Sequence, residues 1–131
     1  MEKTRTIFII EDSAILPEII SVSIKQQFDC KTILFKNADL AMNYLSKCVP
    51  DLIVLDYKYN EKKLKFHTGL EFLVAFRKKF KIPVVVFSGQ RDKQVAVEII
   101  KQGANDYINK DEDDFMDGLL LSVRDILKIK V

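Results

Sequence analysis

The chain has 131 residues, 48% of them hydrophobic and 31% charged, with a formal net charge of +2. This length suits one domain, and the balance of apolar and charged residues excludes a disordered or collagen-like chain. No apolar run approaches the ~20 residues that span a bilayer, and no secretory signal is evident, so we expect a cytoplasmic protein without a membrane partner. The small net charge does not indicate direct nucleic-acid binding, and solvated lysine-rich faces are preferred to a nucleic-acid patch.

Strand and helix patterns alternate along the first half of the chain. Residues 6–10 form an apolar strand, and Pro17 fits the first turn of the helix that follows. Residues 32–35 form a second strand, and Asn37 can cap a second helix. Residues 51–56 read as a buried third strand. The first helix is predicted to bury one face, made of Leu16, Ile19, Ile20, Ile24 and Phe28.

The second half repeats the alternation. Gly69 opens a third helix, and residues 82–87 form the fourth strand. A fourth helix runs to Gly103, a natural left-handed cap, and a short strand at 106–108 precedes a last helix from about Glu112. The inward side chains predicted for the fourth helix are Val95, Ala96, Ile99 and Ile100.

Five strand and helix units with near-continuous apolar strands predict a parallel sheet covered on both faces. We therefore expect residues 1–131 to form one α/β domain with a flavodoxin-like, doubly wound sheet in the order 2-1-3-4-5 and five helices. In that order the first and third strands flank the point where ligands bind, outside the carboxyl ends of the strands.

Carboxylates gather at that edge. Asp51 and Asp56 stand at opposite ends of the third strand, roughly 16 Å apart, so only Asp56 belongs to the carboxyl edge. Glu11 and Asp12 follow the first strand and reach the same edge. Three carboxylates offer only oxygen ligands, which favours a hard cation such as Mg²⁺.

A hydroxyl and an ammonium reach the edge from the remaining strands. Ser88 follows the fourth strand and Lys110 follows the fifth. Phosphoryl transfer needs an oxygen nucleophile, a divalent ion and fixed donors to the phosphoryl oxygens. Asp56 would be the nucleophile, Ser88 and Lys110 the donors, and an aspartyl phosphate the product.

These motifs, in this order, resemble a response-regulator receiver domain of two-component signalling over nearly the whole chain. The matching segments are Glu11-Asp12, Pro50-Asp51, Asp56, Ser88-Gly89, residues 103–107 and Lys110. The resemblance implies that Asp56 accepts a phosphoryl group from a phosphohistidine. It also implies that Mg²⁺ is bound by Asp12, by Asp56, by Glu11 through water, and by the main-chain carbonyl of Lys58.

The resemblance implies a switch in which Ser88 binds the phosphoryl group and Tyr107 turns inward, which changes the surface of the fourth helix, fifth strand and fifth helix. The expected partners are a histidine kinase or histidine phosphotransfer protein and a downstream protein. No enzyme activity is expected beyond slow self-phosphorylation from small donors and self-dephosphorylation. Two alternatives stay open: a receiver-like interaction module that is never phosphorylated, and an ordinary half-buried role for Tyr107.

Two features depart from the family pattern. Asp111 follows Lys110, where many receivers have a proline with a cis bond, which leaves the shape of that loop open. The connection from Tyr57 to Gly69 is long, and it contains His67, interpreted as a loop residue, and four lysines: Lys58, Lys62, Lys63 and Lys65. These lysines would steer an anionic donor, dock a partner, or be solvated without a kinetic role. Cys30 and Cys48 lack a metal-ligand spacing and are expected to be buried free thiols.

Overall fold

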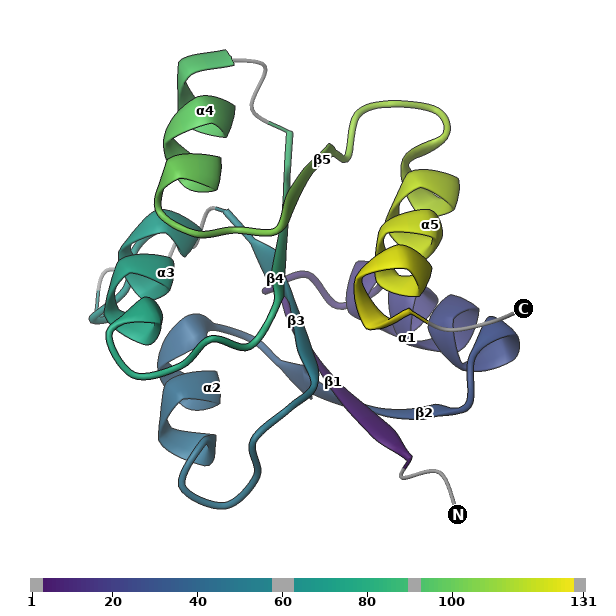
Figure 1. Cartoon of the computed structure of the whole chain (residues 1–131), viewed down its shortest axis with the longest axis horizontal. Coiled ribbons are helices and arrows are strands. Elements are labelled where there is room, and N and C mark those ends of the chain that lie inside the picture. The colour runs from purple at the N-terminus through teal and green to yellow at the C-terminus, as the bar shows by residue number, and fades with distance from the viewer. Residues whose placement is uncertain (1–3, 58–62, 90–92, 129–131) are drawn as a thin grey trace.

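The computed structural model describes residues 4–57, 63–89 and 93–128, in which strands and helices alternate (Figure 1). The strands are β1 (Arg5–Ile10), β2 (Cys30–Phe35), β3 (Leu52–Asp56), β4 (Val84–Ser88) and β5 (Asp106–Asn109). The helices are α1 (Leu16–Gln27), α2 (Ala38–Tyr44), α3 (Gly69–Arg77), α4 (Lys93–Lys101) and α5 (Phe115–Leu127). All neighbouring strands pair in parallel, in the order β2-β1-β3-β4-β5. The predicted flavodoxin-like, doubly wound fold is confirmed.

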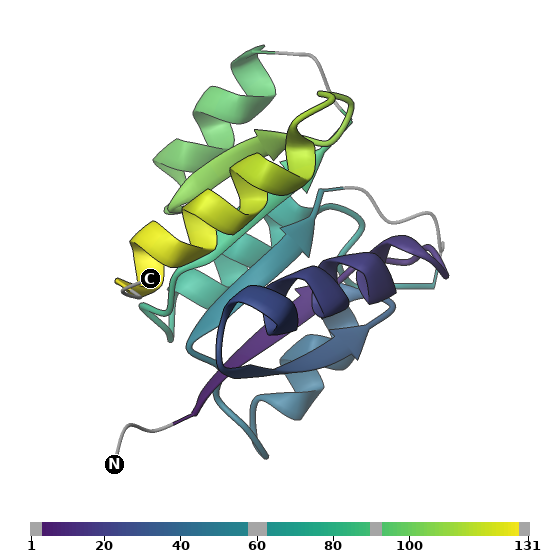
Figure 2. The ribbon, with the colours of Figure 1, turned by 90° about the vertical axis from the view of Figure 1, so that its right-hand side faces the viewer.

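Two apolar cores lie on the two faces of the sheet. Helices α2, α3 and α4 cover one face, and α1 and α5 cover the other, as Figures 1 and 2 show. On β1, Phe8 and Ile10 point to the first core while Ile7 and Ile9 point to the second, because side chains alternate along a strand. The strands are thus buried on both sides, which explains their continuous apolar sequence.

The sequence places most helix faces correctly, but two apolar residues predicted to face inward are exposed. Ile19 on α1 is 48% exposed and Ile100 on α4 is 46% exposed, whereas their neighbours Ile20 and Ile99 are fully buried. Each helix touches the sheet along a narrow stripe, and the adjacent position is turned about 100° away. Apolar spacing alone does not say which of two consecutive isoleucines lies in the stripe.

Pro17 and Asn37 lie at the starts of their helices, as predicted. Pro17 lies in the first turn of α1, and the side chain of Asn37 accepts a hydrogen bond of 2.9 Å from the backbone N–H of Leu40 at the start of α2. Thr68 caps α3 by accepting from the N–H of Glu71 at 3.2 Å. Helix α5 begins at Phe115, later than predicted, because residues 110–114 form tight turns before it.

The end of the long connection before α3 is held against the body of the domain. The Asp39 carboxylate on α2 accepts the backbone N–H groups of Lys65 at 2.7 Å and Phe66 at 3.0 Å. The Phe66 ring is buried and meets Phe72 edge to face, with ring centroids 5.7 Å apart. The exposed His67 follows as a loop residue. This part of the connection is therefore anchored by α2 and the core.

At the amino edge of the sheet, the side chain of Arg77 connects the loop before β4 to the loop before β5. Its guanidinium donates to the carbonyl of Gly103 at 3.0 and 2.8 Å and to the carbonyls of Phe80 at 3.2 Å and Ile82 at 2.7 Å. Gly103 has a φ of +106°, and a Cβ there would lie 2.9 Å from the Arg77 Nε. Gly103 therefore provides both the left-handed turn and the space for the arginine.

Both cysteines are free thiols; Cys30 is buried, whereas Cys48 is only half-buried. In the described ranges no helix is both long and apolar enough to cross a bilayer.

Candidate functional site

Three carboxyl groups meet at the carboxyl edge of the sheet, beyond β1 and β3. Glu11 is 4% exposed and Asp56 is 3% exposed, whereas Asp12 lies at the surface. One oxygen from each of the three lies within 4.8 Å of the others. The sequence predicted this convergence from strand order alone, since parallel strands present their carboxyl ends at one edge.

Asp51, at the other end of the same segment, has a structural role. Its Oδ2 accepts the backbone N–H of Thr6 at 2.7 Å, and its own N–H donates to the Thr6 carbonyl at 2.8 Å. These two bonds join the chain before β3 to β1 at the amino edge. Asp51 is therefore remote from the three-carboxylate group, as predicted.

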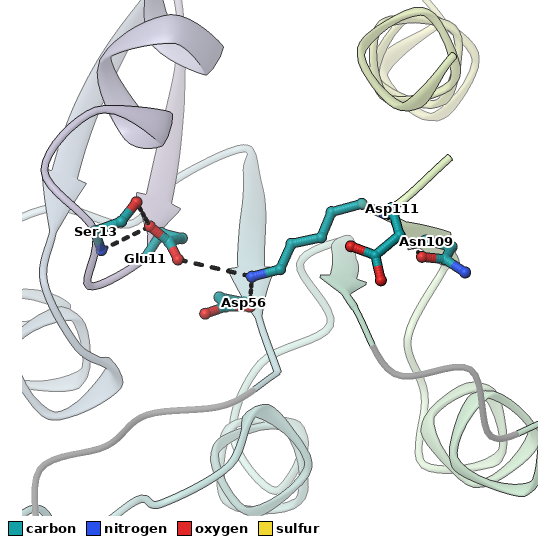
Figure 3. A network of polar contacts seen from close by, with 6 residues as sticks. Glu11, Ser13, Asp56, Asn109 and Asp111 are labelled. Carbon is teal, nitrogen blue, oxygen red and sulfur yellow. Dashed lines mark hydrogen bonds and ion pairs between the residues drawn. The ribbon is translucent and has the colours of Figure 1, made fainter. Parts of the chain in front are cut away.

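Lys110 reaches into the group from the loop after β5. Its Nζ lies 3.5 Å from Oδ1 of Asp56 and 4.0 Å from Oε1 of Glu11 (Figure 3). The same ammonium lies 5.9 Å from the centre of the Phe87 ring. The single positive charge thus contacts two of the three carboxyl groups without neutralising the whole group.

Burial raises the pKa of Asp56 to about 7, because the ionised carboxylate loses its hydration. The positive charge of Lys110 opposes this rise, while the nearby charges of Glu11 and Asp12 and a hydrogen bond with Glu11 add to it. The charged form of Asp56 is therefore under-compensated by the protein alone. A further cation at this position would lower the pKa and favour the carboxylate.

Ser13 orients Glu11, a contact that the sequence alone does not predict. The backbone N–H of Ser13 donates to Oε2 of Glu11 at 2.7 Å, and the Ser13 hydroxyl donates to the same oxygen (Figure 3). Oε1 of Glu11 is left to face Lys110. The available signal was a serine two positions after an acid that ends a strand, a spacing at which side chains and backbone commonly bond within turns.

Ser88 and Tyr107 lie on neighbouring strands. Ser88 is buried at the end of β4, and its hydroxyl hydrogen-bonds the phenol of Tyr107. Burial raises the pKa of Tyr107, so the phenol stays neutral across the physiological range. The two predicted switch residues are therefore in direct contact through their hydroxyl groups.

The two ends of the connection between β3 and α3 meet beside the site. The N–H of Gly69 donates to the carbonyl of Tyr57 at 2.5 Å, and a Cβ on Gly69 would lie 2.9 Å from the carbonyl oxygen of Asp56. Glycine at position 69 thus allows α3 to begin beside the site. Lys58, whose carbonyl was predicted as a metal ligand, lies outside the described residues, as does Lys62.

The donor set suits a hard divalent cation. Glu11, Asp12 and Asp56 supply oxygen ligands only, and one of them is exposed, so water can complete the coordination. The raised pKa of Asp56 is a second sign that positive charge is in deficit here. These residues fit Mg²⁺ better than Zn²⁺, which prefers nitrogen and sulfur ligands.

Comparison with known proteins gives a consistent result. A family model described as the response regulator receiver domain matches residues 7–118. The phosphate regulon transcriptional regulatory protein PhoB of Klebsiella pneumoniae is 29% identical over 109 residues, which cover 81% of this chain and 45% of that protein. A protein-glutamate methylesterase/protein-glutamine glutaminase of Treponema denticola is 34% identical over 119 residues, covering 84% of this chain and 29% of that protein.

The chain thus spans less than half the length of these curated relatives. Among solved structures, the receiver domain of NtrX from Brucella abortus superposes with a TM-score of 0.81 at 26% identity, covering 95% of this chain and 99% of that one. The parallel sheet, the acidic carboxyl edge and the family match over residues 7–118 agree, and the chain belongs to the response regulator receiver domain family.

Proposed function

We propose that this chain, over residues 1–131, is a phosphoacceptor switch of a two-component or phosphorelay pathway. The observation that carries the proposal is the position of Asp56: a buried carboxyl, 3.5 Å from the Lys110 ammonium, whose oxygens lie close to those of Glu11 and Asp12. The donor would be the phosphohistidine of a histidine kinase or of a histidine phosphotransfer protein. The expected cytoplasmic location, without direct nucleic-acid or membrane contact, is part of this proposal.

In the transfer step, an oxygen of the Asp56 carboxylate forms a bond to phosphorus. The bond from phosphorus to the histidine nitrogen breaks, and its electron pair returns to the imidazole. Lys110 binds one phosphoryl oxygen and the Ser88 hydroxyl binds another, so that fixed donors replace water around the transferred group. Glu11, Asp12 and Asp56, with the carbonyl of Lys58, would hold Mg²⁺, which supplies charge neutralisation for the incoming anion.

The switch follows from the contact between Ser88 and Tyr107. The Ser88 hydroxyl serves one partner well at a time, and a phosphoryl oxygen carries more negative charge than a phenol. Recruitment of Ser88 would break its present bond and change the packing of Tyr107 on β5. We propose that this repacking alters the surface formed by α4, β5 and α5, which a downstream protein reads.

Intact-mass measurement tests the proposal. The wild-type protein, incubated with Mg²⁺ and acetyl phosphate, or with a phosphorylated histidine partner, is expected to gain one acid-labile phosphate. Asp56→Asn is expected to gain none. Equal incorporation in both proteins would contradict the assignment of Asp56, and no incorporation in wild type from any donor would favour an interaction module that is never phosphorylated.

A further inference from the structure

A fourth carboxylate, that of Asp111, lies at the rim of the candidate site. Its Oδ2 is 3.2 Å and its Oδ1 is 3.4 Å from the place where a Cβ on Gly89 would lie. The carboxylate thus occupies the space that a side chain at position 89 would need. Figure 3 shows the Asp111 carboxylate beside the end of β4. It lies near the side chain of Lys110, whose ammonium contacts Asp56.

The alternation of side chains along β4, continued one residue beyond its end, would place position 89 on the same face of the sheet as Asp56. On β4, Val85 and Phe87 point to the core beneath α1 and α5, and position 89 continues that alternation. On β3, Val54 points to the same core and Asp56 continues the alternation.

Asp56 lies opposite Phe87, so position 89 is two residues, roughly 7 Å, further along the same face. A phosphoryl group on Asp56 would project beyond the end of β3 at this same edge of the sheet, where the Asp111 carboxylate lies beside position 89. The Lys110 ammonium, above the Phe87 ring, lies on the same face.

The loop that carries Asp111 is held in place by the backbone. The N–H of Lys110 donates to the Ser88 carbonyl at 2.9 Å, and the N–H of Asp111 donates to Oδ1 of Asn109 at 2.9 Å. Within the described part of the chain, the Asp111 carboxylate forms no ion pair with a cation. It is exposed and faces water, on a loop whose backbone is held by these two hydrogen bonds.

We propose that Asp111 orients the water that hydrolyses the aspartyl phosphate, and so sets how long the phosphorylated state lasts. The inference rests on the proposed function of Asp56. The water oxygen forms a bond to phosphorus, and the bond from phosphorus to the Asp56 oxygen breaks. The electron pair returns to the Asp56 carboxylate, inorganic phosphate leaves, and the proton lost from water passes through the Asp111 carboxylate to solvent.

The test measures the decay of phosphorylated protein after the small donor is removed, by intact mass at fixed Mg²⁺. Asp111→Asn keeps the shape of the side chain and removes its charge, and we expect it to lengthen the lifetime on the order of tenfold. Asp113→Asn is the matched control, since Asp113 is an exposed carboxylate of the same loop whose atoms are not among the nearest to the Cβ position of Gly89, and its lifetime should equal that of wild type. Binding of beryllofluoride, a stable phosphoryl mimic, is followed by NMR on the same variants and should be unchanged.

Every outcome of these measurements either supports the role of Asp111 or overturns it. An unchanged lifetime in Asp111→Asn, or an equal lengthening in Asp113→Asn, would overturn the inference. A longer lifetime with proportionally tighter beryllofluoride binding would show that Asp111 acts by repelling the phosphoryl group, which also overturns a role in orienting water. If wild type takes up no phosphate, the proposed function of Asp56 fails instead, and this inference with it.

Discussion

The Nζ of Lys110 lies 3.5 Å from Oδ1 of Asp56, a carboxyl group whose pKa is nevertheless raised to about 7. Burial removes more stabilisation from the ionised form than one ammonium restores. In the absence of a bound cation, the protein therefore carries a destabilising charge at the place where it is proposed to react. Such conflicts between stability and chemistry are common at functional sites.

Asp56→Asn should stabilise the metal-free protein. The pKa of Asp56 rises from 3.8 to about 7 on folding, so the folded protein binds this proton more tightly than the unfolded chain does. The free energy of unfolding should then fall as the pH rises between those values, and Asp56→Asn should remove that fall. At pH 8 with a chelator, we expect a gain on the order of 4 kcal/mol, measured by urea unfolding.

Asp113→Asn, which changes an exposed carboxylate instead, should keep the wild-type pH profile. A wild-type stability that is flat between pH 4 and pH 7, about the window that the shift predicts, would contradict the assigned pKa.

Mg²⁺ should offset the loss of stability that the ionised carboxylate of Asp56 causes. Its binding to the folded state alone would raise the free energy of unfolding by about 2.7 kcal/mol at a hundred times the dissociation constant. Asp12→Asn removes one exposed ligand without disturbing the core, so it should weaken the Mg²⁺ effect. With chelator it should raise the stability slightly, because the charge of Asp12 contributes to the raised pKa of Asp56. Thermal unfolding over a Mg²⁺ titration measures both; an equal Mg²⁺ response in the two proteins would place the ion elsewhere.

Arg77→Ala should destabilise the fold without touching the site. The guanidinium satisfies the carbonyls of Gly103, Phe80 and Ile82, and its loss leaves these groups partly unpaired. We expect a cost of about 2–4 kcal/mol in urea unfolding. Arg77→Lys should recover little, because one ammonium cannot bond to both loops as a planar guanidinium does.

Lys78→Ala, at the adjacent exposed position, is the control and should stay within about 0.5 kcal/mol of wild type. Gly103→Ala should also destabilise, because of its positive φ and the close approach of Arg77. If Arg77→Ala unfolded at the wild-type urea concentration, the hydrogen bonds of Arg77 would contribute no net stability.

Charge reversal tests the lysine-rich connection. Lys63 and Lys65 are exposed, and the backbone of Lys65 is bound by Asp39, so changing these side chains leaves the anchor intact. The triple change of Lys62, Lys63 and Lys65 to Glu, with Lys58 kept, should slow phosphorylation by every anionic donor, most clearly at low salt, if the lysines steer.

If the connection docks a partner, only transfer from the cognate histidine protein should slow. Rates equal to wild type at all ionic strengths would mean that these lysines are solvated and have no kinetic role.

The sequence predicts the fold and the meeting of Glu11, Asp12 and Asp56 because both depend on strand order. Apolar runs identify the strands, and right-handed parallel connections leave few arrangements, so the polar residues that follow each strand must share one edge. Lys110 joins that edge for the same reason, and it does so at 3.5 Å from Asp56.

The contacts that the sequence did not reveal depend on loop conformation. The carboxylate of Asp111 faces Gly89, and the carboxylate of Asp39 binds the N–H groups of Lys65 and Phe66. The guanidinium of Arg77 bonds to the backbone carbonyls of Gly103 and Ile82. Periodicity carries no information about such pairs, since they join residues that no helix or strand relates to each other.

The hydrogen bond between the N–H of Gly69 and the carbonyl of Tyr57 closes the long connection into a loop whose two ends meet. The entropy of closing a loop grows only with the logarithm of its length, so each doubling costs about 0.6 kcal/mol. Lengthening or shortening the chain between these two residues should therefore cost little stability while the bond and the Phe66 anchor remain. In evolutionary terms, this is a place where the chain can gain or lose residues beside the candidate site without rebuilding the sheet, and in engineering terms it is a position for inserting a reporter peptide.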